Sequence, residues 1–327
     1  MTSTTSIPSA PPFASLATRL SPLSIAALLC LALIWGLSIP ITKLALESMP
    51  PMTLTALRFG IAVPILFLFA LGHRRLPLRA LPQVVALGLL GIGIGQVAQT
   101  FGIVGTSASV GTVISAVIPV LVVVFAALRL HQPVTGWQRI GLAAAFAGIA
   151  LVASGQGDGS TAGQTTALGV LLMLISALAI AFYYVWSVEL TASHGTVTVA
   201  AWSTLAGFLA LLPFTGWEIA QTPFRVEPVA VAAAAYLGLL VTAAGLFLWL
   251  WLLRTVPARI AASVQFLQPL FGIAASAALF GDKMGLYFAL GVVLVLLGVG
   301  LTSTTLRARK GPDCDAPPER KVVPTSG

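Results

Sequence analysis

Residues 108–130 read ASVGTVISAVIPVLVVVFAALRL, an apolar run with one charged residue, Arg129, and a proline, Pro119, near its middle. About 20 apolar residues in a helix span the roughly 30 Å hydrocarbon core of a bilayer. The run is therefore long enough for a transmembrane helix. Residues 258–280, ARIAASVQFLQPLFGIAASAALF, repeat the pattern with Pro269 at the matching position.

The composition of the whole chain indicates the same class of protein. Charged residues make up 8% of the 327 residues and apolar residues 58%, with a mean hydropathy of +1.01. A soluble domain carries about 25% charged residues, so this composition excludes the soluble globular class. It also excludes a disordered chain and, with two cysteines, a disulfide scaffold. The net charge of +8 lies mostly in loops and the tail, which favours topology over nucleic-acid binding as its explanation.

Further apolar runs of similar length follow one another along the chain, with brief connections between them. The sequence predicts an all-α membrane protein with ten transmembrane helices, at residues 24–46, 52–72, 81–102, 108–128, 136–154, 167–190, 197–214, 229–252, 258–280 and 284–304. The seventh run is the shortest and the weakest of these.

The longest internal connection, residues 155–166, is rich in Gly, Ser and Thr and divides the expected helices into two sets of five. We expect a first repeat over residues 23–154 and a second over residues 167–304. The polar segments 1–22 and 305–327 are expected to be disordered.

The basic residues predict the orientation, because cytoplasmic loops carry an excess of Lys and Arg. With a cytoplasmic N-terminus, only Lys43, Arg58, Arg225 and Lys283 of the 17 basic residues fall on the other side, which leaves 13 in the cytoplasm. This bias predicts an inner-membrane protein with both termini in the cytoplasm. The thirteen are Arg19, Arg74, Arg75, Arg79, Arg129, Arg139, Arg254, Arg259, Arg307, Arg309, Lys310, Arg320 and Lys321.

A shift of 150 residues superimposes landmarks of the two halves. Pro119 falls on Pro269, and small residues of the fifth span fall on the tenth, where Gly141 meets Gly291 and Gly148 meets Gly298. Each repeat has an odd number of spans, so the two copies must lie in opposite orientations. Inverted-topology repeats are common in secondary transporters, with the substrate site near the midplane at their interface.

Several segments carry a resemblance to a known family. Residues 31–46, LALIWGLSIPITKLAL, and 50–69, PPMTLTALRFGIAVPILFLF, resemble the opening of an EamA-type member of the drug/metabolite transporter superfamily. Residues 107–152 and 256–301 resemble the end of the same unit in each copy, and the resemblance covers about residues 24–304.

This resemblance implies ten helices, cytoplasmic termini, and small metabolites or amino acids as cargo, usually exported. The acidic residue that closes a repeat in the family is present as Asp282. In the first copy the matching position holds Gln132, which departs from the pattern.

Pro119 and Pro269 lie about halfway along their spans. A proline removes one backbone hydrogen bond and frees a carbonyl group, which a membrane tolerates only where neighbours or cavity water satisfy it. We expect each proline to act as a hinge beside the substrate cavity. A static kink is the alternative.

Two pairs of glutamines share a helix face at i,i+3 spacing, Gln96 with Gln99 and Gln265 with Gln268. Amides are unfavourable against lipid, so these side chains should face the bundle or water. They are candidates to line a cavity and hydrogen-bond a polar substrate. Hydrogen bonding between helices is the alternative.

Aromatic side chains at depth are further candidates for the substrate site. Trp35 lies near the middle of the first span, where its indole N–H needs a partner, and we expect it to form a pocket wall. Tyr183 and Tyr184, with Trp186 nearby, are candidates from the sixth span, although part of that group could belong to an interfacial belt. Core packing is the alternative for Trp35.

Lys43, Glu47 and Arg58 gather near the outer ends of the first two spans, and the first two are at i,i+4 spacing. The sequence predicts an outer ion cluster that reaches the membrane interface. An outer gate or an anchor for a substrate carboxylate is the alternative. The glycines at 91, 93 and 95, and Gly141, Ala145 and Gly148, are expected to allow close helix packing.

The sequence favours a secondary transporter of small organic metabolites such as amino acids, an exporter or facilitator that works by alternating access. A nucleotide-sugar or phosphate-ester exchanger is an alternative, and a membrane scaffold or enzyme subunit is another. No catalytic, metal-binding or Walker motif is present, so we expect no enzyme activity and no cofactor. The expected partners are the small-molecule substrate and the lipid bilayer, without nucleic acid, and a homodimer is allowed but not required.

Overall fold

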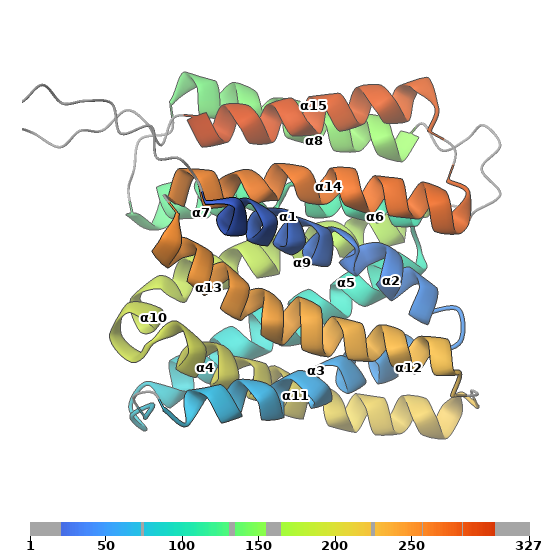
Figure 1. Cartoon of the computed structure of the whole chain (residues 1–327). Coiled ribbons are helices and arrows are strands. Elements are labelled where there is room, and N and C mark those ends of the chain that lie inside the picture. The colour runs from blue at the N-terminus through green and yellow to red at the C-terminus, as the bar shows by residue number, and fades with distance from the viewer. Residues whose placement is uncertain are drawn as a thin grey trace, which may run out of the picture.

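The computed structural model describes residues 21–72, 75–130, 135–154, 165–223, 226–256, 258–282 and 284–304. Within these ranges every regular element is a helix and none is a strand (Figure 1). Of the segments expected to be disordered, residues 1–20 and 305–327 lie outside the described residues, as do residue 132 and most of the 155–166 connection. The expectation for residue 22 is wrong, because Pro22 begins the first helix.

The described residues of the first half form nine helical segments. They are α1 (Pro22–Gly36), α2 (Ser38–Ala45), α3 (Pro51–Ala70), α4 (Leu81–Leu87), the π-helix η1 (Gly88–Ile94), α5 (Gly95–Val104), α6 (Ala108–Ser115), α7 (Ile118–Leu130) and α8 (Gly136–Ser154).

The described residues of the second half form eight. They are α9 (Ala167–Trp186), α10 (Val188–His194), α11 (Thr196–Gln221), α12 (Pro228–Ala235), the π-helix η3 (Tyr236–Ala244), α13 (Gly245–Thr255), α14 (Ala258–Phe280) and α15 (Leu286–Thr304).

Among the described residues, eight helices are long and apolar enough to cross a membrane. They are Pro22–Ala45, Pro51–Ala70, Leu81–Val104, Ala108–Arg129, Gly136–Ser154, Ala167–Trp186, Thr196–Gln221 and Pro228–Thr255. Shorter apolar helices lie at Leu267–Phe280 and Leu286–Thr302. The described part of the chain therefore has the all-helical architecture of a multi-pass membrane protein.

The seventh expected span is longer than its sequence suggests. The expectation that it ends near residue 214 is wrong, because α11 continues through Pro213 to Gln221. The apolar run ends early in the sequence because Pro213 and Glu218 lower the hydropathy of the last turns of this helix. Glu218 is satisfied inside the protein, where its carboxylate accepts hydrogen bonds from Met52 N and Thr53 N at the start of α3.

Two π-helices occupy corresponding places in the two halves. The segment η1 begins at Gly88 and η3 includes Gly238, and these residues are 150 positions apart. Each π-helix continues an α-helix on both sides, so each of these long spans is wound more loosely at its centre. Such segments are rare and occur frequently at functional sites.

A seam of glycines joins α8 to α15, which lie side by side along one edge of the molecule (Figure 1). A Cβ added at Gly141 would lie 2.7 Å from the carbonyl oxygen of Gly298, and one at Gly148 would lie 2.7 Å from that of Gly291. Any side chain would therefore collide with the opposite backbone. The expected packing role of the glycines in the fifth span is confirmed.

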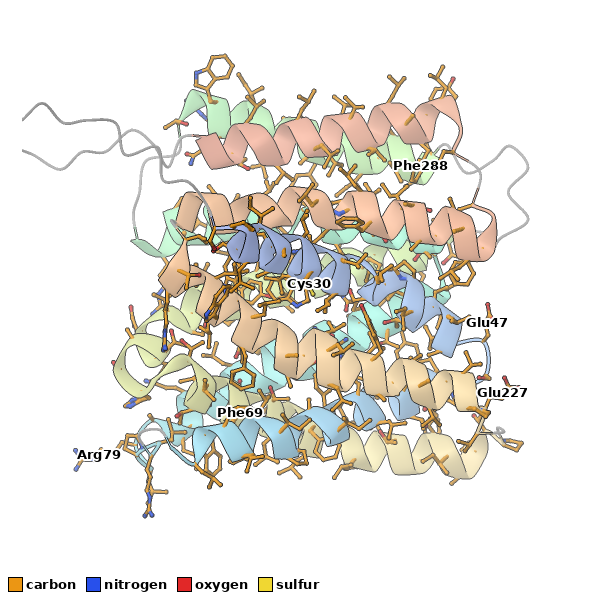
Figure 2. The ribbon with its side chains drawn as sticks, viewed as in Figure 1. Cys30, Glu47, Phe69, Arg79, Glu227 and Phe288 are labelled. Carbon is orange, nitrogen blue, oxygen red and sulfur yellow. The ribbon has the colours of Figure 1, made fainter. Side chains whose placement is uncertain are left out.

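The two ends of the bundle differ in charge. Figure 2 shows Arg79 at one end and Glu47 and Glu227 at the other. The end with Arg79 also holds the last turn of α7, with Arg129, and that of α13, with Arg254. We call these the basic end and the acidic end.

Candidate functional site

Trp35, from α1, contacts the π-helix η3 of the other half. Its indole Nε1 donates to the carbonyl oxygen of Val241 at 3.1 Å, and Tyr236 Oη from η3 donates back to Ile34 O at 2.9 Å. A Cβ at Gly245 would collide with the indole nitrogen. The indole N–H, which lies within the membrane-spanning region, thus has a hydrogen-bond partner. The role of Trp35 as a pocket wall stays a prediction.

Tyr183, from α9, packs against η1 in a comparable way. A Cβ at Gly91 would collide with the tyrosine ring. Because Gly91 has no side chain, the ring can pack directly against the backbone of η1. Tyr183 Oη and Ser203 Oγ of α11 are 2.9 Å apart and share a hydrogen bond. Each half therefore places an aromatic side chain on the π-helix of the other half.

Arg58 lies two turns inside α3 and joins residues of both halves. Its Nε donates to Thr242 Oγ1 of η3 at 3.1 Å, and its Nη1 donates to Gln96 Oε1 of α5 at 3.1 Å. The structure therefore brings together Arg58 and Gln96, which the sequence treats as separate candidates. Tyr184 of α9 lies within electrostatic range of the guanidinium.

The expected grouping of Arg58 with Lys43 and Glu47 differs from what the structure shows. Lys43 Nζ donates to three carbonyl oxygens at the end of α5, those of Ile103 at 2.8 Å, Val104 at 3.2 Å and Thr106 at 2.8 Å. An ammonium group stabilises a helix C-terminus in this way. Glu47 is exposed and forms no ion pair within the described residues.

The remaining glutamines are distributed over two helices. Gln99 is half-buried on α5, one turn from Gln96 toward the acidic end. Gln268 is half-buried on α14, whose backbone at this residue approaches Gly36 so closely that a Cβ there would lie 2.7 Å from Gln268 O. The side chain of Gln265 lies outside the described part of the chain.

The two matched prolines lie in different surroundings. Pro119 follows a break at residues 116–117, which separates α6 from α7. Pro269 is buried within the uninterrupted helix α14. The proposed hinge role of each proline is untested, but only the first coincides with an interruption of the helix.

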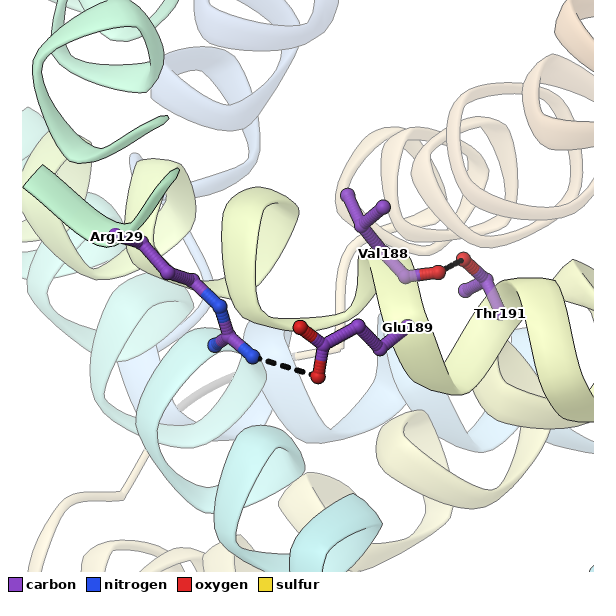
Figure 3. Close-up of polar contacts among 4 residues, drawn as sticks. All are labelled: Arg129, Val188, Glu189 and Thr191. Atoms are coloured by element: carbon purple, nitrogen blue, oxygen red, sulfur yellow. Dashed lines mark hydrogen bonds and ion pairs between the residues drawn. The ribbon is translucent and has the colours of Figure 1, made fainter. Parts of the chain in front are cut away.

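A cavity of about 650 Å³ opens at the basic end, between the residues before α4 and the helices α4, α9 and α10. Phe182 and Trp186 form an apolar wall, with ring centroids 4.1 Å apart. Arg129 Nη2 lies 2.8 Å from Glu189 Oε2 (Figure 3). The Arg129 guanidinium also lies over the Trp186 ring, 5.0 Å from its centroid. The wall also includes Arg79, Gln83, Leu87, Leu90, Ser193 and His194.

The sequence did not identify this cavity. Arg129 and Glu189 are 60 residues apart and come from opposite halves of the chain. No spacing rule relates them, because α10 is a separate short helix that turns away after Ser187. The only sequence feature that pointed to the cavity was a charged residue at the end of each of the two spans, Arg129 and Glu189.

At the acidic end, two carboxylates bind the first turns of helices in the other half. Glu218 holds the start of α3, as described above, and also accepts from Thr53 Oγ1 at 2.8 Å. Asp282, which follows α14 and is only 8% exposed, accepts from Ser109 N of α6 at 3.0 Å. Carboxylates stabilise helix N-termini. In the described residues no group of His, Cys, Asp or Glu is placed to hold a metal ion.

Comparisons with known proteins agree with this architecture. The sequence model of the EamA-like transporter family matches residues 22–154 and again residues 167–304. An "Uncharacterized inner membrane transporter YedA" of Escherichia coli (strain K12) is 28% identical over 285 residues, covering 83% of this chain and 90% of the relative. A "Probable amino-acid metabolite efflux pump" of the same strain is 27% identical over 296 residues, covering 86% and 95%.

One solved structure, titled "Crystal structure of protein", matches with a TM-score of 0.59 at 17% identity, covering 88% of this chain and 99% of the other. At this identity the likeness supports the fold alone.

The bundle of long apolar helices, with polar and aromatic side chains between its halves, defines a multi-pass membrane protein of the transporter class. The family model covers most of the chain in two successive matches. The chain belongs to the EamA-like transporter family.

Proposed function

We propose that this protein is a secondary transporter that exports small organic metabolites such as amino acids across the inner membrane by alternating access. The observation that carries the proposal is the set of polar contacts between the halves at η3. Trp35, Tyr236 and Arg58 all take part in it. A solute held there would touch both halves, so a rocking of one half against the other would move it.

The unequal ends of the molecule support alternating access. At the acidic end, Glu218 and the buried Asp282 bind the other half through backbone N–H groups. At the basic end, the described halves are linked by the ion pair of Arg129 with Glu189, whose carboxylate side chain is 73% exposed, beside the open cavity. Exposed pairs contribute about 0–1 kcal/mol. This arrangement fits a state closed at the acidic end and open at the basic end.

We further propose ten spans in two inverted five-helix repeats, with α14 and α15 as the last two. The seam supports this topology. The 150-residue shift relates Gly141 to Gly291 and Gly148 to Gly298. Exchanging the matched residues of the two halves therefore turns the Gly141–Gly298 contact into the Gly291–Gly148 contact, and both are close. A two-fold axis in the membrane plane would have this effect. With the basic end in the cytoplasm, both termini are cytoplasmic.

A nucleotide-sugar or phosphate-ester exchanger is less well supported. Phosphate recognition generally needs several basic groups. In the described spans Arg58 is a deep cation, while all three donors of Lys43 are directed to carbonyl oxygens. The names of the relatives also give no support for a scaffold or enzyme subunit.

Transport by the purified chain in liposomes tests the proposal. Liposomes loaded with unlabelled amino acids should take up the matching labelled amino acid by counterflow, saturably and faster than protein-free liposomes. A folded protein that moves no member of the panel, or that moves only nucleotide sugars, would contradict the proposed cargo. Cysteines introduced by Leu78→Cys and Glu227→Cys should be labelled from opposite faces, with the first reached only from the cytoplasm.

A further inference from the structure

Arg58 is a charged side chain inside the membrane-spanning region whose described contacts are all uncharged. Thr242 Oγ1 and Gln96 Oε1 accept its hydrogen bonds, and its guanidinium carbon lies 5.4 Å from the centroid of the Phe59 ring. Hydroxyl and amide oxygens solvate a cation but do not neutralise it. The charge of Arg58 is therefore not compensated by these neighbours.

The acidic residues that the structure describes do not supply a counter-ion. Glu47, Glu189, Glu218, Glu227 and Asp282 lie at helix ends or in connections, and the ion pair found among the described residues joins Arg129 to Glu189. An unpaired buried charge is strongly unfavourable. Charged residues at this depth usually face a cavity and mark a substrate pathway.

The guanidinium group of Arg58 also has a hydrogen-bond donor available to a ligand. Arginine donates from Nε and from both terminal nitrogens, and the described residues engage Nε and Nη1 but not Nη2. Arg58 is half-buried, so its side chain remains partly accessible. Tyr184 keeps 52% of its surface accessible. Neither side chain is sealed off by its neighbours, so a ligand can reach the guanidinium group.

The polar groups near the Arg58 guanidinium also include hydrogen-bond donors. Gln96 accepts from Arg58 through Oε1, so its Nε2 amide group remains to donate. Thr242 cannot donate to a ligand while its hydroxyl donates to Leu237 O at 2.8 Å. Tyr184 has a phenolic O–H. A set of donors around one positive charge selects a ligand with acceptor oxygens and one negative charge.

We propose that Arg58 binds the carboxylate of the transported solute, with the Gln96 amide as a second donor. The inference rests on the proposed transport function and names the substrate class as carboxylate-bearing organic solutes. Arginine forms paired, charge-assisted hydrogen bonds with a carboxylate, which are about twice as strong as neutral ones. Trp35 and the tyrosines supply aromatic surface for the rest of the solute.

Binding to the purified full chain in detergent tests the site separately from transport. The probes are L-phenylalanine and L-leucine, each paired with its amide, and sodium chloride as an inorganic anion. Thermal stabilisation of the wild type should need at least tenfold less acid than amide. Arg58→Gln should abolish that preference, Arg58→Lys should keep part of it, and Arg254→Gln, at an exposed position in the last turn of α13, should keep all of it.

An acid preference that survives in folded Arg58→Gln would overturn the site, and so would stabilisation by chloride equal to that by the acids. If Arg58→Gln does not fold, Gln96→Leu decides. A severalfold loss of acid binding with unchanged amide binding supports the site, and unchanged acid binding refutes it. Acid-selective binding without counterflow would refute the transport proposal and leave the Arg58 site standing.

Discussion

Each half of the chain packs an aromatic side chain against the π-helix of the other half, but the hydrogen bonds at the two contacts are different. Tyr183 lies on η1 and hydrogen-bonds the side chain of Ser203. Trp35 lies on η3 and hydrogen-bonds a backbone carbonyl oxygen, and Arg58 reaches the same π-helix through Thr242. Aromatic packing recurs at both π-helices, whereas among the described residues a cation hydrogen-bonds a side chain of η3 but none of η1. A duplicated scaffold can therefore carry a single specialised site.

The largest effect is expected where the halves are most alike, in the glycine seam. Gly148→Ala and Gly291→Ala should each destabilise the protein by about 1–3 kcal/mol, the usual effect of overpacking. Each new Cβ would lie 2.7 Å from the opposite carbonyl oxygen. Gly216→Ala is the matched control, because nothing lies within 4 Å of a Cβ there. Thermal unfolding of the purified variants measures the difference, and equal stability of all three would refute the seam.

A smaller effect, on the transport rate, should distinguish Trp35 from the neighbouring Trp249. Trp35→Ala should lower counterflow about tenfold, which corresponds to about 1.4 kcal/mol, with membrane abundance near normal. Trp249, whose ring centroid lies 5.8 Å from that of Trp35, is the control, and Trp249→Ala should have less effect. A fall in abundance equal to the fall in transport would indicate that Trp35 only supports the fold.

The paired prolines should differ in their effect on rate. Pro119→Ala restores a backbone N–H beside the break between α6 and α7, so the span can become continuous. We expect counterflow about fivefold slower, equivalent to about 1 kcal/mol. Pro269→Ala lies in a helix that is already continuous and should change the rate by less. Equal slowing by both variants would indicate that the hinges are equivalent.

Much of the scaffold could be predicted from sequence, because helix-length apolar runs are a local property. The positions of eight spans and the packing of Gly141 and Gly148 followed from composition and spacing. The end of α11 did not, because Glu218 lowers the hydropathy while its carboxylate is satisfied by the start of α3. A contact with a distant segment decided that boundary.

The candidate site was less predictable for the same reason. Arg58 was grouped with Lys43 and Glu47 because all three lie near the outer ends of the first two spans. In the structure, Lys43 holds the end of α5, and Arg58 reaches Thr242, which is 184 residues away. The partner of a deep charge depends on which helices are neighbours, and no local pattern contains that information.

The smallest effect is expected from a pH gradient, because the described acids of both halves lie at their ends and none lies at the middle of a span. A proton-coupled carrier usually has a carboxyl group within the membrane. We expect that transport follows the gradient of the solute itself. Liposomes with a pH gradient, and a membrane potential clamped by potassium and valinomycin, should therefore not concentrate a transported amino acid above equilibrium.

Accumulation that a protonophore abolishes would show this expectation to be wrong, and two variants would then locate the carrier. Glu47 is exposed at the acidic end, whereas Asp282 is buried and its Oδ1 has no hydrogen-bond partner in the described residues. Loss of accumulation in Asp282→Asn but not in Glu47→Gln would assign the proton to the carboxylate that links the halves through Ser109. The second half alone would then supply the coupling group, since the matching position of the first half holds Gln132.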